Sequence, residues 1–116
     1  MTTTIDDILK RVYGALKRIT PNVYHLQAPS GDDSRYPYLV YSLVSDVPGV
    51  SGDDVEITHT ATVRIHVVTR QGGYGVLLLQ VYNAMNELGF RRISTNEMKD
   101  TDNSIVCIVD FKIGVI

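Results

Sequence analysis

Residues 55–70 read VEITHTATVRIHVVTR, and this stretch decides the fold. Its odd-numbered positions are mostly apolar and its even-numbered positions are mostly polar. Such alternation predicts a β-strand with one face in the core and the other in solvent or against a partner. A strand of this length exceeds what a small domain needs. Either a bulge breaks this strand, or its first half, residues 55–60, projects as a hairpin arm with the end of the preceding strand, and we favour the arm.

An amphipathic helix is predicted after this strand, beyond a turn at residues 71–73. Gly89 ends it, because glycine accepts the left-handed conformation that commonly follows a helix. The strand buries one face and the helix buries one stripe, and together they form the layer pair on which the domain is built. The apolar stripe of the helix consists of Tyr74, Leu77, Val81, Met85 and Leu88.

The remaining elements complete the order α-β-β-β-α-β-β. Residues 5–19 are predicted to form a first helix, with Thr4 and Asp7 as a capping box at its start. This order lacks βαβαβ alternation and so argues against a parallel, doubly wound sheet. We expect one domain over residues 1–116, an α+β fold whose mostly antiparallel sheet has two helices packed on one face. The other strands are predicted over residues 23–26, 36–45, 90–94 and 105–113, with loops at 28–35 and 46–54.

The predicted strand 36–45 is apolar on both faces. Val40 and Val44 lie on one face, and Leu39 and Tyr41 lie on the other. A strand of this type is covered on both sides in its working state. Because two layers cover only one side, we expect the second cover to come from another subunit.

Composition places the chain among ordinary soluble single-domain proteins. It has 116 residues, of which 44% are hydrophobic and 21% charged, and its net charge of -2 offers no broad basic field for nucleic acid. The single cysteine, Cys107, lies in an apolar run and is predicted to be a core residue. No signal peptide is evident, and no apolar stretch approaches the ~20 residues of a membrane span, so a cytoplasmic protein is expected.

No motif for catalysis, cofactor or metal is found. His25, His59 and His66 lack metal-ligand spacing, and residues 72–75 (GGYG) lack the Lys and Ser/Thr that complete a phosphate loop. The acidic loop residues show no calcium-loop spacing. We therefore expect no catalytic residues, no cofactor and no metal, and a protein that is not an enzyme.

Tyrosines and basic residues mark a candidate partner interface. The chain has seven Tyr and no Trp, and several Tyr cluster around the loop 28–35. Tyrosine is enriched at interfaces because it supplies area at low entropic cost and has a polar tip. Basic residues on the polar strand face, with Arg91 and Arg92, could form a strip that contacts a partner, although a solvated sheet face explains them equally. The predicted interface consists of Tyr36, Tyr38, Tyr41, Arg64, His66 and Arg70.

The order of elements resembles the tail-completion proteins of long-tailed bacteriophages, also called tail terminators or head-to-tail joining proteins. The resemblance rests on the strand start YPYLVY at residues 36–41, the acidic Pro/Gly loop that follows, the long alternating strand, and the helix exit Leu88-Gly89-Phe90. It covers almost the whole chain in the order and size of the elements.

This resemblance implies a structural role in a virion. Similar proteins form a ring, usually hexameric, at the head-proximal end of the tail tube, where they stop tube growth and face the head connector. The implied partners are other copies of the chain, the tail tube protein and the head connector protein, and DNA passes through without specific binding. The subunit is expected to be monomeric until it meets a tube end. The alternative is a small regulatory or ligand-binding α+β module that acts as a dimer and has a tyrosine-lined pocket.

Overall fold

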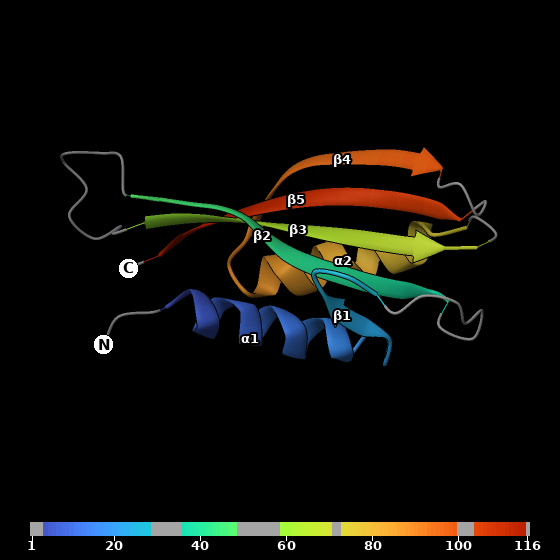
Figure 1. Cartoon of the computed structure of the whole chain (residues 1–116), viewed down its shortest axis with the longest axis horizontal. Coiled ribbons are helices and arrows are strands. Elements are labelled where there is room, and N and C mark those ends of the chain that lie inside the picture. The colour runs from blue at the N-terminus through green and yellow to red at the C-terminus, as the bar shows by residue number, and fades with distance from the viewer. Residues whose placement is uncertain (1–3, 29–35, 49–58, 71–72, 100–103, 116) are drawn as a thin grey trace.

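A five-stranded sheet with two helices on one face makes up the described part of the protein (Figure 1). The structure is a computed structural model that describes residues 4–28, 36–48, 59–70, 73–99 and 104–115. The expected α+β class and the order α-β-β-β-α-β-β are confirmed. The elements are α1 (Ile5–Lys17), β1 (Val23–His25), β2 (Tyr38–Pro48), β3 (His59–Thr69), α2 (Gly75–Glu87), β4 (Arg91–Lys99) and β5 (Ile105–Val115).

The strands lie in the order β1-β2-β3-β5-β4. Only β1 and β2 pair in parallel, and every other neighbouring pair is antiparallel, as expected. The decisive strand β3 lies at the centre, paired along its full length with β5 from His59↔Val115 to Thr69↔Ile105. The nine-residue strand β4 and the three-residue strand β1 form the two edges.

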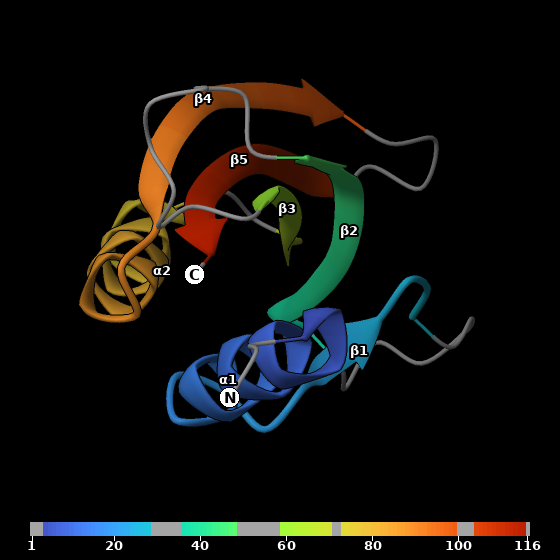
Figure 2. The ribbon, with the colours of Figure 1, turned by 90° about the vertical axis from the view of Figure 1, so that its left-hand side faces the viewer.

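The core lies between the sheet and the helices. The odd-numbered residues Ala61, Val63, Ile65 and Val67 of β3 are fully buried, as their alternation predicts. Figure 2 shows both helices on the same side of the curved sheet. They bury their apolar stripes against it through Ile8, Val12 and Leu16 of α1 and Val81 and Met85 of α2.

The predicted capping box of α1 and the predicted glycine exit of α2 are both present. The amide of Asp7 donates to Thr4 Oγ1 at 3.2 Å, and the amide of Thr4 donates to Asp7 Oδ2 at 3.1 Å, which completes the capping box. These hydrogen bonds lower the pKa of Asp7. Gly89 has the left-handed φ of 96° that follows α2. Helix α1 ends at Lys17 rather than residue 19, and the amide of Ile19 donates to the carbonyl of Leu16 in the terminal turn.

Three strands extend beyond their predicted ends. β2 starts at Tyr38 and continues to Pro48, because a register shift between Leu43 and Ser45 lets it keep pairing with β3. β4 continues to Lys99 rather than residue 94, although its sequence is polar, because it pairs with β5 throughout. β5 runs to Val115 rather than residue 113. Cross-strand pairing thus overrides local sequence at these ends.

The pairing predicted between residues 55–60 and the end of β2 is present where the structure describes it, at His59 and Thr60, but β5 flanks these residues on the other side. His59 pairs with Pro48 on one side and Val115 on the other, and Thr60 likewise lies between β2 and β5. The longer β5 gives the start of β3 a second neighbour, so these residues belong to the sheet. Residues 55–58, and most of the predicted loops 28–35 and 46–54, lie outside the described residues.

The expectation that β2 needs another subunit to cover its second face is wrong at Val40. Val40 is 8% exposed within the single chain, on the face away from the helices. Val44, beside the bulge, is 45% exposed and lacks such cover. No helix within the described ranges is both long and apolar enough to cross a membrane.

Candidate partner interface

The six predicted interface residues occupy three places in the fold. Tyr36, Tyr38 and Arg70 lie near the start of β2 and the end of β3, Arg64 and His66 lie midway along β3, and Tyr41 faces the helices. They therefore form no single surface. Whether any of them contacts a partner stays a prediction.

The tyrosines near the start of β2 form an aromatic group. The ring centroids of Tyr36 and Tyr38 are 5.2 Å apart, and Tyr24 of β1 meets Tyr38 edge-on at 5.9 Å. The guanidinium of Arg70 lies 5.2 Å from the centroid of Tyr36, within the range of a cation–π contact. This group, which we call the tyrosine end, joins a cation to amphipathic rings, as partner-binding surfaces do.

Tyr41 belongs to the core side of the sheet. It is 8% exposed, its ring stacks on His25 at 4.8 Å, and it contacts Tyr13 of α1 at 6.1 Å. Burial raises the pKa of its hydroxyl. A charged substitution at Tyr41 would disturb folding before it reported on any interface.

Arg64 and His66 lie on the sheet face away from the helices. Arg64 forms a two-pronged salt bridge with Asp110 of β5, which raises the pKa of the guanidinium. His66 is half-buried, and burial lowers its pKa, followed by repulsion from Arg64. The imidazole is therefore neutral near pH 7, and the charge of Arg64 is compensated inside the chain.

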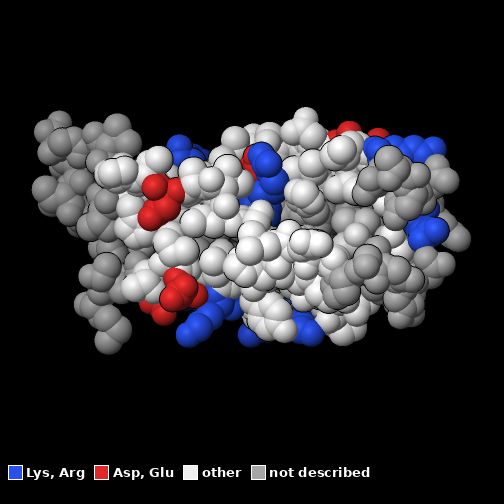
Figure 3. Space-filling model, in the orientation of Figure 1, with Lys and Arg blue, Asp and Glu red and all other residues white. Residues whose placement is uncertain are grey.

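The basic strip considered from the sequence is interrupted. Arg91 pairs in register with Lys112 on the face that carries Arg64, but Arg92 lies on the helix side, its guanidinium 4.2 Å from the Tyr82 ring centroid. On the side shown in Figure 3, Lys and Arg lie at the end where β3 and β4 finish, and also near the middle and along the edge formed by α1. Positive charge on this side is thus spread over several separate places.

Sequence analysis missed several exposed apolar side chains on α2 and β4. Val76 and Leu79 of α2 are 74% and 57% exposed, and Ile93 and Met98 of β4 are 53% and 51% exposed. The run Val76-Leu77-Leu78-Leu79 carried the information, since four successive apolar residues surround a helix and cannot all face one core. Large exposed apolar side chains are candidate contacts for a partner.

The edge strand β4 is exposed on both faces. Every residue of β4 except Ser94 is exposed. Its helix-facing side is held by side chains of α2, where the hydroxyls of Tyr82 and Thr95 lie 2.7 Å apart and the Tyr74 hydroxyl donates to Glu97. The outer edge of β4 has no neighbouring strand in the described sheet, and such edges can accept a further strand.

Comparisons with known proteins assign no family to this chain. No protein-family model matches the chain, and no curated protein matches it. Among solved structures, a chain of one described as "Virion of native gene transfer agent (GTA) particle" is similar over 90% of each chain, with 13% identity and a TM-score of 0.46. At this identity and TM-score, the likeness assigns no function to this chain. Within the described residues, no group of three His, Cys, Asp or Glu side chains is placed to hold a metal.

Proposed function

We propose that this chain is a structural virion protein that forms a ring at the head-proximal end of a phage tail tube. The observation that carries the proposal is the set of large apolar side chains left in solvent on α2 and on the edge strand β4. A subunit that buries such surface only on assembly would stay soluble alone and associate with its own copies.

A ring requires two different surfaces on each subunit. Head-to-tail contacts close into a ring when a patch on one copy fits a distinct patch on the next. The described sheet has two unlike edges, the long strand β4 and the short strand β1 beside the tyrosine end. We propose that β4 with α2 contacts the tyrosine end of the neighbouring subunit.

The remaining partners follow from this placement. The tail tube protein would lie on one face of the ring and the head connector protein on the other. DNA would pass through without specific binding, since the net charge of -2 gives little hold on phosphates. In this proposal the protein is part of the virion, assembles in the host cytoplasm and is not an enzyme.

The dimeric ligand-binding module remains a second candidate because one observation favours it. A cavity of about 380 Å³ is lined in part by Tyr36 and Tyr74, which fits the tyrosine-lined pocket expected of that alternative. The volume is within the range of small-molecule sites. A stable dimer in solution at low concentration would favour this candidate.

The test is electron microscopy of particles made after this reading frame is deleted from its source genome. Filled heads beside unjoined or overlong tails are the expected result. Normally joined virions, or a genome that makes no virions, would overturn the proposal. Restoring the intact frame in trans is the control, because it separates loss of this chain from effects on neighbouring genes.

A further inference from the structure

A hollow of about 280 Å³ opens on the sheet where β4 begins and β5 ends. Gly114 of β5 lies opposite Thr60 of β3 in register and carries no side chain, which leaves space on the sheet at this point. Glycine within a strand often marks a place where a ligand approaches the backbone closely. The described residues that line the hollow are Thr60, Gly89, Arg91, Lys112, Ile113 and Gly114.

Arg91 and Lys112 place two positive charges side by side at this hollow. They are direct partners in the antiparallel pairing of β4 with β5, so their side chains leave the sheet on the same face. Both residues are exposed, and neither has a hydrogen bond or an ion pair within the described part of the chain. Like charges opposite each other in a sheet destabilise it, and an anion between them would remove this repulsion.

The acidic residue on the same face of β5, Asp110, does not neutralise this pair. Asp110 lies opposite Arg64 on one side and Ser94 on the other. Both of its carboxylate oxygens accept hydrogen bonds from Arg64, so its charge is engaged there. The described residues that line the hollow include no Asp or Glu. The charges of Arg91 and Lys112 are therefore uncompensated at the hollow.

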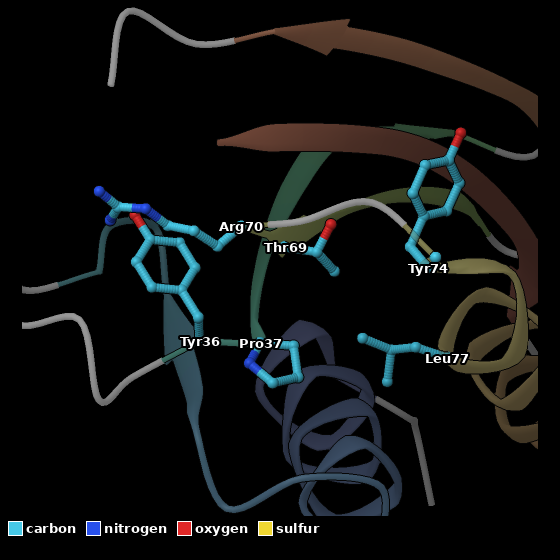
Figure 4. A pocket seen from close by; sticks show the side chains of 7 residues that line it. Tyr36, Pro37, Thr69, Arg70, Tyr74 and Leu77 are labelled. Atoms are coloured by element: carbon cyan, nitrogen blue, oxygen red, sulfur yellow. The ribbon is translucent and has the colours of Figure 1, made fainter. Parts of the chain in front are cut away.

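The larger pocket at the end of β3 lacks such a pair of cations. Arg70 is the only charged residue among the described residues that line that pocket, and Figure 4 shows its side chain beside Tyr36. The guanidinium of Arg70 lies 5.2 Å from the ring centroid of Tyr36, so this cation is already engaged within the chain. An anion is therefore better accommodated between Arg91 and Lys112.

We propose that Arg91, Lys112 and Thr60 bind a phosphate group in this hollow. A guanidinium matches two phosphate oxygens at once, an ammonium adds a point charge, and a threonine hydroxyl can donate to a third oxygen. Two cations suit phosphate better than a single carboxylate, which has one charge and two oxygens. The phosphate comes from a nucleic-acid backbone or from free phosphate, and the probes below distinguish the two sources. The inference rests on the hollow alone and is independent of the proposed ring.

The first experiment is a titration of the ¹⁵N-labelled full chain with inorganic phosphate at constant ionic strength, followed by NMR. Saturating shifts of the Thr60, Arg91, Lys112 and Gly114 amides are expected. Acetyl-Asp-Asp-amide carries a similar negative charge on two carboxylates and should bind at least about fivefold more weakly than the phosphate probe that binds, because its oxygens cannot contact both cations from one centre. Equal or tighter binding of this peptide would overturn the assignment to phosphate.

A single-stranded thymidine oligonucleotide without terminal phosphates separates the two sources. If a nucleic-acid backbone supplies the phosphate, the oligonucleotide should shift the same amides at a lower total phosphate concentration than inorganic phosphate does, and its affinity should fall as salt rises. If free phosphate is the ligand, only inorganic phosphate should shift them. Either result supports the phosphate site. Failure of both probes to shift these amides with saturation would overturn the proposal.

Variants separate a binding role from a structural one. Arg91→Gln and Lys112→Gln should each lower the affinity for the phosphate probe at least about fivefold, because each loses a charge-assisted contact. Their melting temperatures should hold or rise, because the repulsion between the two cations is removed. Lys99→Gln, at the other exposed end of β4, removes the same charge and is the matched control, with affinity unchanged. Unchanged affinity in both Arg91→Gln and Lys112→Gln, or an equal loss in Lys99→Gln, would overturn the proposal.

Discussion

Arg64 and Asp110 face each other across β3 and β5 and form a two-pronged salt bridge on the sheet face away from the helices. Arg64 Nε donates to Asp110 Oδ1 at 2.8 Å, and a terminal guanidinium nitrogen donates to Oδ2 at 3.1 Å. The two residues are 46 positions apart in the chain and are brought together by the register of the central strands. The charge of Arg64 is thus engaged inside the subunit.

This pair predicts a measurable coupling between the two residues. A double-mutant cycle with Arg64→Gln and Asp110→Asn should give an interaction energy of about 1 kcal/mol, since the guanidinium is partly solvated. Urea unfolding at low and high salt measures it, and the coupling should shrink as salt rises. Lys112→Gln combined with Arg64→Gln is the control and should be additive. A coupling of zero for Arg64 and Asp110 would contradict the pairing.

His66 predicts a loss of stability on mild acidification. Its pKa is lowered below the usual 6.5, so the unfolded chain binds more protons than the folded chain. The free energy of unfolding should therefore fall as pH drops from about 6.5 through the folded pKa, with no contribution from this group at higher pH. Arg64 and Asp110 lie near His66 on this face, and Val40 and Ile108 flank it in register.

Denaturant unfolding of wild type and His66→Gln on both sides of pH 6.5 checks this expectation. The variant should lack the fall in that window. Both proteins should still lose stability in stronger acid, where Asp7, whose pKa lies below its usual 3.8, becomes protonated and its capping box weakens. If the free energy of unfolding falls equally for both proteins as pH drops below about 6.5, His66 is not the responsible group.

Two glycines predict opposite effects of the same substitution. Gly14 lies in the middle of α1, and the position that a Cβ would take is open, so Gly14→Ala should stabilise the protein by about 0.5–1 kcal/mol. Gly89 has a φ of 96°, so Gly89→Ala should destabilise it by about 1 kcal/mol through backbone strain. Chemical denaturation of the two variants provides the comparison. If both substitutions changed the free energy of unfolding in the same direction, the assigned conformation of Gly89 would be contradicted.

Replacing Tyr41 by Ala is predicted to lower the free energy of unfolding more than replacing Tyr36 by Ala. Tyr41→Ala should lower the free energy of unfolding by about 3 kcal/mol, because the ring is 8% exposed and fills the core. Tyr36→Ala, at the partly exposed tyrosine end, should cost about 1 kcal/mol or less. Urea unfolding measures both values. Assembly is therefore best tested at Tyr36, and similar costs at both positions would contradict their placement.

The exposed apolar residues of α2 predict an assembly defect without a folding defect. Val76→Gln and Leu79→Gln should change the free energy of unfolding by no more than about 0.5 kcal/mol, because both side chains already lie in solvent. Under the proposed function, complementation of the deleted frame with the double variant should yield fewer joined particles. Gln80→Ala, exposed on the same helix, is the control. Full joining by the double variant would count against α2 as an interface.

The interior of the fold was accessible to sequence analysis because periodicity reports directly on burial. The alternation of β3 identified Ala61, Val63, Ile65 and Val67 as core, and the helical stripe identified Val81 and Met85. Local chemistry also predicted the Thr4–Asp7 cap and the glycine exit at Gly89. These features depend on neighbours within a few residues, so one sequence suffices.

The ends of strands and the partners of polar residues could not be predicted from the sequence in this way. The polar sequence of β4 predicts a strand only to residue 94, yet pairing with β5 carries it to Lys99. The candidate site depends on such long-range pairing even more. The pocket beside Thr69 joins the segment before β2, the end of β3 and the start of α2, and no local pattern indicates that the Thr69 hydroxyl lacks a partner.

The sequence by itself determined the order of elements, the class of fold and the face of each element that enters the core, because side-chain spacing fixes these locally. Only the tertiary structure decided that Arg64 is paired with Asp110, that Tyr41 is buried, and that Val76 is left in solvent. Each of these outcomes depends on which distant segment lies opposite. The physical reason is that strand register and packing depend on contacts between distant segments. The spacing of side chains within one segment does not reveal those contacts.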